Sequence, residues 1–262
     1  MMLASLPMYD FPEIREHTDL LWDAIAASAR EVGLSDVPSS LTRPEGSLAN
    51  HWRRDDIFLS HTCGYPVVRE LPGVWVLGSF SVSSGTRAGF YRSAIVARES
   101  DPRSLLGLVS FDAAPMAANG EDSLSGWVSL GWALANADIA AGSVTFTGSH
   151  ASSVLAVRDG LADLASIDAH SLALFARHRP DSVRGLTVVA QGPEVAMTPL
   201  ITARPDLVDP LRSVVTKALE KFSPKSLRAL MITGWVPHGR REHEPVTALA
   251  DAALAVLAAL PR

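Results

Sequence analysis

The chain has little of several features on which whole classes of protein depend. Cys63 is the single cysteine among 262 residues, which excludes an internal disulfide framework and a cysteine-rich metal site. No run of about 18 apolar residues occurs, so we predict no membrane span. The 23 Lys and Arg against 28 Asp and Glu give a formal net charge of -5, which argues against a nucleic-acid-binding surface.

Several motifs of common active sites are missing as well. The chain contains no GxxxxGK[ST], GxGxxG or HExxH segment, so nucleotide-binding and zinc-protease functions lose their usual support. Gly148-Ser149-His150 lacks the GxSxG form of a nucleophile elbow. His61 and Cys63 are too isolated for a zinc site. We therefore expect neither a metal nor a cofactor.

The N-terminal residues lack the pattern of a secretory signal. Residues 1–7 contain no Lys or Arg and reach Pro7 almost at once, whereas a signal has a basic region, an apolar region and a cleavage site. They are typical of a first core strand instead. We expect either a chain made without a leader or one that begins after its leader.

What the chain does contain is an alternation of strand-like and helix-like segments. With 47% apolar residues, it can form one large domain or two modest ones. The alternation favours an α/β fold with mostly parallel sheets. Residues 83–92 and 191–198 are polar or glycine-rich and are the best candidates for crossings between two domains. Strands are expected at residues 3–6, 57–60, 74–82, 93–97, 116–118, 144–146, 164–167 and 186–190, and helices at 14–32, 125–137, 169–177, 206–222 and 244–260.

Polar residues gather where the predicted strands end. In open α/β sheets, ligands bind beyond the carboxyl ends of the strands. All three tyrosines of the chain lie at such positions, together with hydroxyls and with glycines that expose the backbone. The segments concerned are Tyr9, His61-Thr62-Cys63-Gly64-Tyr65, Tyr91-Arg92, Asn119 to Gly126, Thr147-Gly148-Ser149-His150 and Asp168.

Ser123, Ser125 and Gly126 lie where a predicted helix begins. Helix N-termini present unpaired N–H groups and a partial positive charge, so they bind anions. Serine hydroxyls can add donors there, and glycine allows a ligand close to the backbone. An ordinary serine cap explains the same residues. His150 begins another helix, where it can donate to an anion or simply pack or cap locally.

Asp168 ends a strand that is otherwise largely apolar. A carboxylate suits an anion site if the ligand carries a proton, as hydrogen phosphate, phosphite or a phosphonate can, because the carboxylate accepts that proton's hydrogen bond. The same carboxylate would repel fully ionised sulfate. The competing interpretation is a helix cap for residue 169 onward. For Cys63 the competing interpretation is a small buried hydrophobe.

In this order, the segments resemble the phosphate, phosphite and phosphonate substrate-binding proteins of ABC transporters. Each segment alone is a weak signal, but the ordered combination is fairly specific and spans about residues 3–205. The matching segments are Leu6-Pro7-Met8-Tyr9, Thr62-Cys63-Gly64-Tyr65-Pro66, Tyr91-Arg92-Ser93, Ser123-x-Ser125-Gly126, Thr147-Gly148-Ser149-His150, Gly160-x-Ala162-Asp163 and Ile167-Asp168.

The resemblance implies an α/β, two-lobed type II periplasmic-binding-protein fold with mostly parallel sheets, helices on both faces and two hinge crossings. The lobes would be residues 1–88 with 196–262, and residues 89–195. A small phosphorus oxyanion or related anion would be clamped in the cleft between them for ABC-type uptake. By resemblance, the oxyanion would be held by Ser123, Ser125, Gly126 and His150, its protonated oxygen by Asp168, and the rest of the ligand by Tyr9, Thr62, Tyr65 and Tyr91.

The resemblance also implies partners and a location. The protein would be a non-catalytic monomer or weak dimer that works with a transporter permease and contacts neither nucleic acid nor the membrane interior. Its location would be periplasmic, although the missing signal pattern leaves a cytoplasmic one open. Leu124 departs from the family pattern, because a further polar residue often lies between the two serines. This departure removes one hydrogen-bond donor from the expected anion site.

Two other functions remain open on the same scaffold. Some thiamine-precursor and menaquinone-pathway enzymes use it, and an enzyme would need a reactive group such as His61, Cys63 or His150. A cytoplasmic ligand sensor that contacts another protein is the other alternative.

Overall fold

The computed structural model describes residues 2–257 of the chain, and its contacts divide them into two compact units. Unit 1 comprises the described part of Met1–Phe90 together with Ala196–Glu244. Unit 2 comprises Tyr91–Val195 and the described part of Pro245–Arg262. The chain therefore passes from one unit to the other three times, after residues 90, 195 and 244.

Unit 1 is built on a five-stranded mixed sheet in the order β1-β2-β11-β3-β12. β11 pairs antiparallel with both β2 and β3, so β1, β2 and β3 run in one direction, and β12 is antiparallel to β3. The strands are β1 (Leu3–Ser5), β2 (Ile57–His61), β3 (Trp75–Val82), β11 (Pro199–Thr202) and β12 (Ile232–Pro237).

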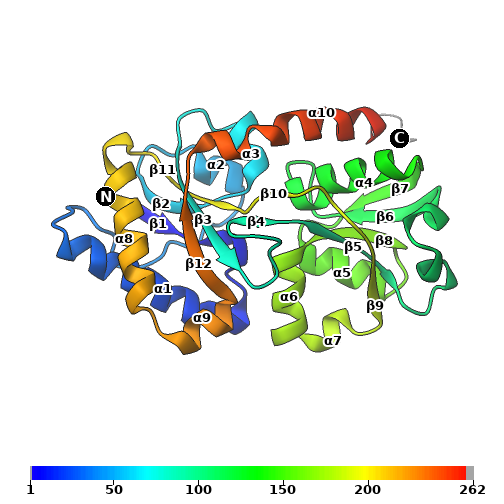
Figure 1. Ribbon diagram of the computed structural model, residues 1–262, viewed down its shortest axis with the longest axis horizontal. Coiled ribbons are helices and arrows are strands. Elements are labelled where there is room, and N and C mark those ends of the chain that lie inside the picture. The colour runs from blue at the N-terminus through cyan, green and yellow to red at the C-terminus, as the bar shows by residue number, and fades with distance from the viewer. Residues whose placement is uncertain (1, 258–262) are drawn as a thin grey trace. The chain divides into compact units, whose positions relative to one another are not determined.

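Two groups of helices pack within unit 1 (Figure 1). α1 (Arg15–Glu31) packs against α8 (Val208–Lys221) and α9 (Pro224–Leu230), and α8 lies on β3 and β12. The apolar stripe of α1 becomes buried because its residues recur at helical spacing. The second group is α2 (Leu48–Trp52) and α3 (Gly64–Arg69), whose Trp52 and Val67 share an apolar cluster with Ile201 of β11.

Unit 2 is built on a second five-stranded sheet, in the order β7-β6-β8-β5-β9. β6 pairs parallel with both β7 and β8, whereas β5 pairs antiparallel with β8 and β9. The carboxyl ends of β7, β6 and β8 therefore meet at one edge. The strands are β5 (Ser93–Arg98), β6 (Ala114–Ala118), β7 (Ala141–Phe146), β8 (Leu164–Asp168) and β9 (Leu186–Gln191).

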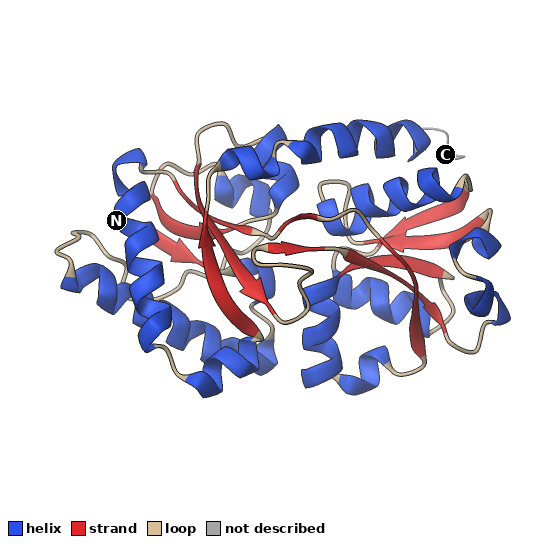
Figure 2. Cartoon of the chain, viewed as in Figure 1, coloured by secondary structure: helices blue, strands red, loops and turns tan. Residues whose placement is uncertain are grey.

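Helices cover both faces of the unit 2 sheet (Figure 2). On one face, a π-helical turn (Leu124–Val128) continues into α4 (Ser129–Ala137), and α10 (Pro245–Leu257) packs on α4. A Cβ atom on Gly131 of α4 would lie 2.7 Å from Leu257 Cδ1, so these two helices pack closely. The helices of the other face are α5 (His150–Arg158), α6 (Ala169–His178) and α7 (Pro180–Val183).

The remaining elements are short. β4 (Phe90–Tyr91) and β10 (Val195–Ala196) form a two-stranded sheet. Single 3₁₀ turns begin several loops, often at a proline, whose fixed φ suits a first helical position. They are Pro7–Tyr9, Pro12–Ile14, Pro102–Leu106, Leu108–Phe111, Pro205–Leu207 and Arg240–His243.

The α/β class expected from the sequence is confirmed, but the sheets are mixed rather than mostly parallel. The expectation missed β11 and β12, which both run antiparallel to their neighbours. The helix expected at 244–260 is present as α10 and packs in unit 2, whereas the expected lobes placed it with residues 1–88. The last three residues of that expected helix lie outside the described residues. Within residues 2–257, no helix has the length and apolarity needed to span a bilayer.

Candidate functional site

The edge of unit 2 where β6, β7 and β8 end gathers most of the predicted anion-binding residues. Asn119 to Gly126 follow β6, Thr147 to His150 follow β7, and Asp168 is the last residue of β8. Because the three strands are parallel neighbours, their following segments emerge side by side. The sheet topology therefore brings residues from three distant parts of the sequence to one edge.

Ser123 caps the π-helical turn that starts at this edge. Its Oγ accepts a hydrogen bond from the Gly126 N–H at 3.0 Å. The N–H groups of Trp127 and Val128 both donate to the Ser123 carbonyl at 3.1 Å, which widens the first turn. A hydroxyl that accepts through its oxygen still has one proton to donate. Ser123 can therefore cap the helix and contact a ligand at the same time.

Ser125 and His150 form a direct hydrogen bond across two strand-end segments. Ser125 Oγ lies 2.7 Å from His150 Nε2. Burial lowers the pKa of His150 to about 4, so the imidazole is neutral near pH 7. If Nε2 carries the ring proton, it donates to Ser125 and leaves the serine hydroxyl proton for a ligand. His150 Nδ1 is buried and has no hydrogen-bond partner among residues 2–257.

The segment before His150 is held in place by its own hydrogen bonds. Thr147 Oγ1 donates to the carbonyl of Ala118 at 3.2 Å, which ties the segment to the end of β6. Gly148 has φ +82°, a left-handed conformation that favours glycine. Ser149 caps α5 by accepting from the Ser152 N–H at 3.1 Å. These contacts orient the first residue of α5, His150.

Asp168 is 3% exposed and caps α6, because its Oδ1 accepts from the Ser171 N–H at 2.7 Å. The cap interpretation is therefore correct, although a carboxylate with two oxygens can cap a helix and still accept elsewhere. Strand alternation places Asp168 and Ser166 on the same face of β8. Ser166 Oγ donates to the Ser125 carbonyl at 2.6 Å. The face that carries Asp168 is thus the face on which Ser125 lies.

In unit 1, Tyr9 ends the 3₁₀ turn that comes after β1, and Thr62 directly follows β2. Thr198 Oγ1 lies 3.2 Å from the Tyr9 hydroxyl and 2.9 Å from His61 Nε2. Burial lowers the pKa of His61 to about 4, and its ring contacts Tyr9 edge-on at 5.4 Å between centroids. Thr62 Oγ1 is buried without a partner in the described part of the chain. The sequence had given no sign of Thr198.

The remaining predicted residues differ in exposure. Tyr65 lies on α3 and is half-buried, whereas Tyr91 lies on β4 and is 1% exposed. His61 and Cys63, which an enzyme would need as reactive groups, are 4% and 8% exposed. The hydrogen bonds of His61 to Thr198 give it a structural role.

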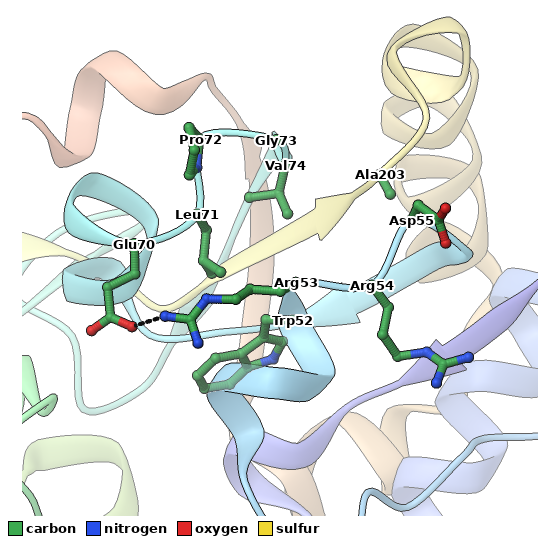
Figure 3. Close-up of a pocket in the computed structure, with 10 residues that line it drawn as sticks. All are labelled: Trp52, Arg53, Arg54, Asp55, Glu70, Leu71, Pro72, Gly73, Val74 and Ala203. Carbon is green, nitrogen blue, oxygen red and sulfur yellow. Dashed lines mark hydrogen bonds and ion pairs between the residues drawn. The ribbon is translucent and has the colours of Figure 1, made fainter.

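A separate hollow of about 370 Å³ lies on unit 1, near the start of β2 (Figure 3). Its two guanidinium groups already have carboxylate partners: Arg53 pairs with Glu70 at 2.6 Å, and Arg54 pairs with Asp56. Trp52 and Leu71 form part of an apolar wall. None of the predicted site residues lines this hollow. It is therefore distinct from the strand-end residues.

A family model described as ABC transporter, phosphonate, periplasmic substrate-binding protein matches residues 54–241. No curated protein matches the sequence.

Solved structures share the fold at low identity. PhnD1 from Prochlorococcus marinus, solved with methylphosphonate, has a TM-score of 0.72 at 11% identity, covering 95% of this chain and 97% of that one. A binding-protein component of an ABC phosphonate transporter from Pseudomonas aeruginosa has a TM-score of 0.73 at 15% identity, covering 98% and 88%. A Xanthomonas citri protein bound to ATP has a TM-score of 0.67 at 18% identity and covers 99% of each chain.

Proposed function

This chain belongs to the family of periplasmic substrate-binding proteins of phosphonate ABC transporters, and we propose that it binds a singly protonated phosphorus oxyanion at the strand-end edge of unit 2. The ligand class is a phosphonate, phosphite or hydrogen phosphate, handed on to a transporter permease. The observation that carries the proposal is the hydrogen bond of 2.7 Å between Ser125 and His150. This bond joins the segment that follows β6 to the segment that follows β7, through the neutral imidazole of His150.

The charge of this residue set favours a ligand of low charge. Ser123 and Ser125 offer neutral hydroxyl donors, and a helix start carries a partial positive charge. His150 is neutral because burial lowers its pKa to about 4. Asp168 adds a negative charge, which a dianion without a proton would oppose. A monoanion with one P–OH group satisfies both the donors and the carboxylate.

Tyr9, Thr62 and Tyr65 of unit 1 are the other residues that we propose for ligand binding. Tyr9 lies in the turn after β1, Thr62 directly follows β2, and Tyr65 lies on α3. The Tyr9 hydroxyl is oriented by Thr198, and Thr62 has a buried hydroxyl still without a partner among the described residues. The proposed role involves no chemical turnover, and His61, one of the groups that an enzyme would need, hydrogen-bonds to Thr198.

A thermal-shift titration of phosphate-free protein tests the proposal. The panel is phosphate, phosphite, methylphosphonate, 2-aminoethylphosphonate, sulfate and small carboxylates. A ligand that binds only the folded state raises the melting temperature as its concentration exceeds the dissociation constant. We expect a selective shift with at least one phosphorus oxyanion, and no shift with any of them up to millimolar concentration refutes the proposed ligand class.

Ser125→Ala then links the binding to this edge. Loss of a hydroxyl donor to a buried anion weakens binding by about 1–3 kcal/mol. Ser129→Ala is the matched control, since Ser129 lies one turn further along the same helix and bonds to Ser93 Oγ at 3.0 Å. We expect the control to keep its affinity. Equal affinities for wild type and Ser125→Ala would remove Ser125 from the site.

A further inference from the structure

Asn119 has an unusual contact with Gly126 at the proposed anion site. Asn119 directly follows β6, and a Cβ atom at position 126 would lie 1.7 Å from Asn119 Oδ1 and 2.9 Å from its Cγ. Gly126 has no positive φ, so its backbone conformation does not require glycine. The glycine is required because the Asn119 amide occupies the space of a side chain.

The oxygen of the Asn119 side-chain amide lacks a hydrogen bond among the described residues. Asn119 Oδ1 is buried and has no hydrogen-bond partner within residues 2–257. It lies against Gly126, in the space that a Cβ atom would take. The reverse orientation would press an N–H₂ group against the same glycine with no acceptor. The oxygen therefore faces the glycine, and Nδ2 lies on the far side of Cγ from it.

An arrangement of this kind is costly unless it serves binding. A buried amide oxygen without a partner destabilises the folded chain, so such a group in a native structure calls for an explanation. The contact with Gly126 holds the Asn119 amide in one place at the strand-end edge, although a ligand bound to Nδ2 would not satisfy the oxygen itself. A second atom without a partner among the described residues, His150 Nδ1, belongs to the same edge through the hydrogen bond of His150 to Ser125.

The residue between the two serines explains why another donor is needed. Leu124 is 1% exposed and packs into the protein, so it contributes no side-chain donor. Ser123 already uses its oxygen to accept from the Gly126 N–H. We infer that the side-chain amide of Asn119 is a further ligand-binding group, whose Nδ2 donates to the bound oxyanion in place of the donor missing at position 124. This inference rests on the proposed function.

Asn119→Ala separates a binding role from a structural one. Removal of an unsatisfied oxygen leaves the melting temperature of the ligand-free protein unchanged or raises it, whereas removal of a structural residue lowers it. Calorimetric titration with inorganic phosphate and methylphosphonate measures affinity. We expect binding about 10- to 100-fold weaker, the loss of one hydrogen bond to a charged ligand.

Two further variants sharpen the test. Asn119→Leu has nearly the same shape but no N–H₂ group and no charge, so we expect it to bind about as weakly as Asn119→Ala. If Asn119 only fills space, Asn119→Leu keeps more affinity than Asn119→Ala, which overturns the inference. Asn136→Ala is the control, because Asn136 is an exposed asparagine of unit 2 whose amide donates to the Trp132 carbonyl. We expect its affinity to equal that of wild type.

Each outcome has a distinct meaning. If wild type binds either probe and Asn119→Ala binds it equally well, the inference fails and the proposed function stands. A clear fall in the melting temperature of ligand-free Asn119→Ala also overturns the inference. If wild type binds neither probe nor any other phosphorus oxyanion of the panel, the proposed function fails and the inference fails with it.

Discussion

Buried neutral histidines should make the folded chain sensitive to mild acid. His61, His150 and His243 are the clearest cases, since burial lowers their pKa values to about 4, 4 and 3. Burial also lowers the pKa values of His51 and His238. His243 is 0% exposed, and neither of its ring nitrogens has a hydrogen-bond partner among the described residues.

The direction of the pH dependence of stability follows from how many protons the folded and unfolded chains bind. An unfolded histidine takes up a proton as pH falls below about 6.5, whereas these folded histidines remain neutral until about pH 4 or lower. The unfolded chain therefore binds more protons in this window, and stability falls as pH falls from about 6.5 toward 4. Between pH 6 and 5, each such histidine lowers the free energy of unfolding by about 1 kcal/mol. His61, His150 and His243 together account for about 3–4 kcal/mol.

Urea unfolding at pH 8, 7, 6 and 5 measures the effect, with hydrogen exchange read by mass spectrometry to assign the loss to each unit. His61 and His243 belong to unit 1 and His150 belongs to unit 2. We expect the opening free energy of the unit 1 core to fall by at least about 2 kcal/mol between pH 6 and 5. The interval from pH 8 to 7 is the internal control, since histidines there are mostly neutral in both states.

His243→Leu tests how much one histidine contributes to the pH dependence of stability. The variant removes two unsatisfied nitrogens and one titrating group, so its unit 1 stability should fall by about 1 kcal/mol less than that of wild type between pH 6 and 5. An unchanged pH dependence in the variant would show that His243 is not a buried neutral group. A loss below about 1 kcal/mol in both units between pH 6 and 5 would refute the reasoning for all three histidines.

Three further substitutions test the site and its support. Gly126→Ala should strongly reduce anion affinity, because the new Cβ would lie 1.7 Å from Asn119 Oδ1; calorimetric titration measures this. Asp168→Asn keeps an oxygen for the α6 cap but loses the charge, so sulfate should gain on hydrogen phosphate by at least about tenfold in a competition titration. Thr198→Val removes the hydroxyl that lies 2.9 Å from His61 Nε2, and urea unfolding should show a loss of about 1–3 kcal/mol.

Matched controls accompany these variants. Gly73→Ala adds the same methyl group where no atom lies within 4 Å, and it should leave affinity unchanged. Thr216→Val removes an exposed hydroxyl that donates to the Arg212 carbonyl within α8, and it should cost less than Thr198→Val. Wild-type affinity in Gly126→Ala, or unchanged anion selectivity in Asp168→Asn, would contradict the roles given to those residues.

Much of the fold could be predicted because local pattern and topology agree along the parallel strands. β2 and β8 are short, largely apolar runs that end in polar residues, and each lies where the sequence placed it. The rule that polar loops follow parallel strands then groups Ser125 and His150 at one edge, and the structure places them in contact.

The antiparallel strands escaped prediction for physical reasons. β11 has four residues, begins at Pro199 and is buried throughout, so it shows no alternation of polar and apolar residues. β12 contains Gly234 and ends at Pro237, and both residues are unfavourable in strands. Their identity as strands depends on pairing with β3, which lies far away in sequence. A short stretch of sequence does not reveal pairing between strands that are so far apart in the chain.

Other features depend on contacts that sequence spacing does not encode. The partner of α10 could not be read from its apolar face, which fits any helix of suitable size. Asn119 resembles an ordinary turn residue until its contact with Gly126 is seen. The neutral state of His150 follows from burial rather than from neighbouring residues in the chain.

The late position of β11 and α10 in the chain has a consequence for biosynthesis. β11 lies between β2 and β3, so the first sheet stays divided until residues 199–202 have left the ribosome. Leu257 of α10 belongs to the same apolar cluster as Trp127 and Leu130, so the second core stays open until residue 257 has been made. The nascent chain therefore carries two uncovered apolar surfaces at once before residues 199–202 are made, and general chaperones can bind to both.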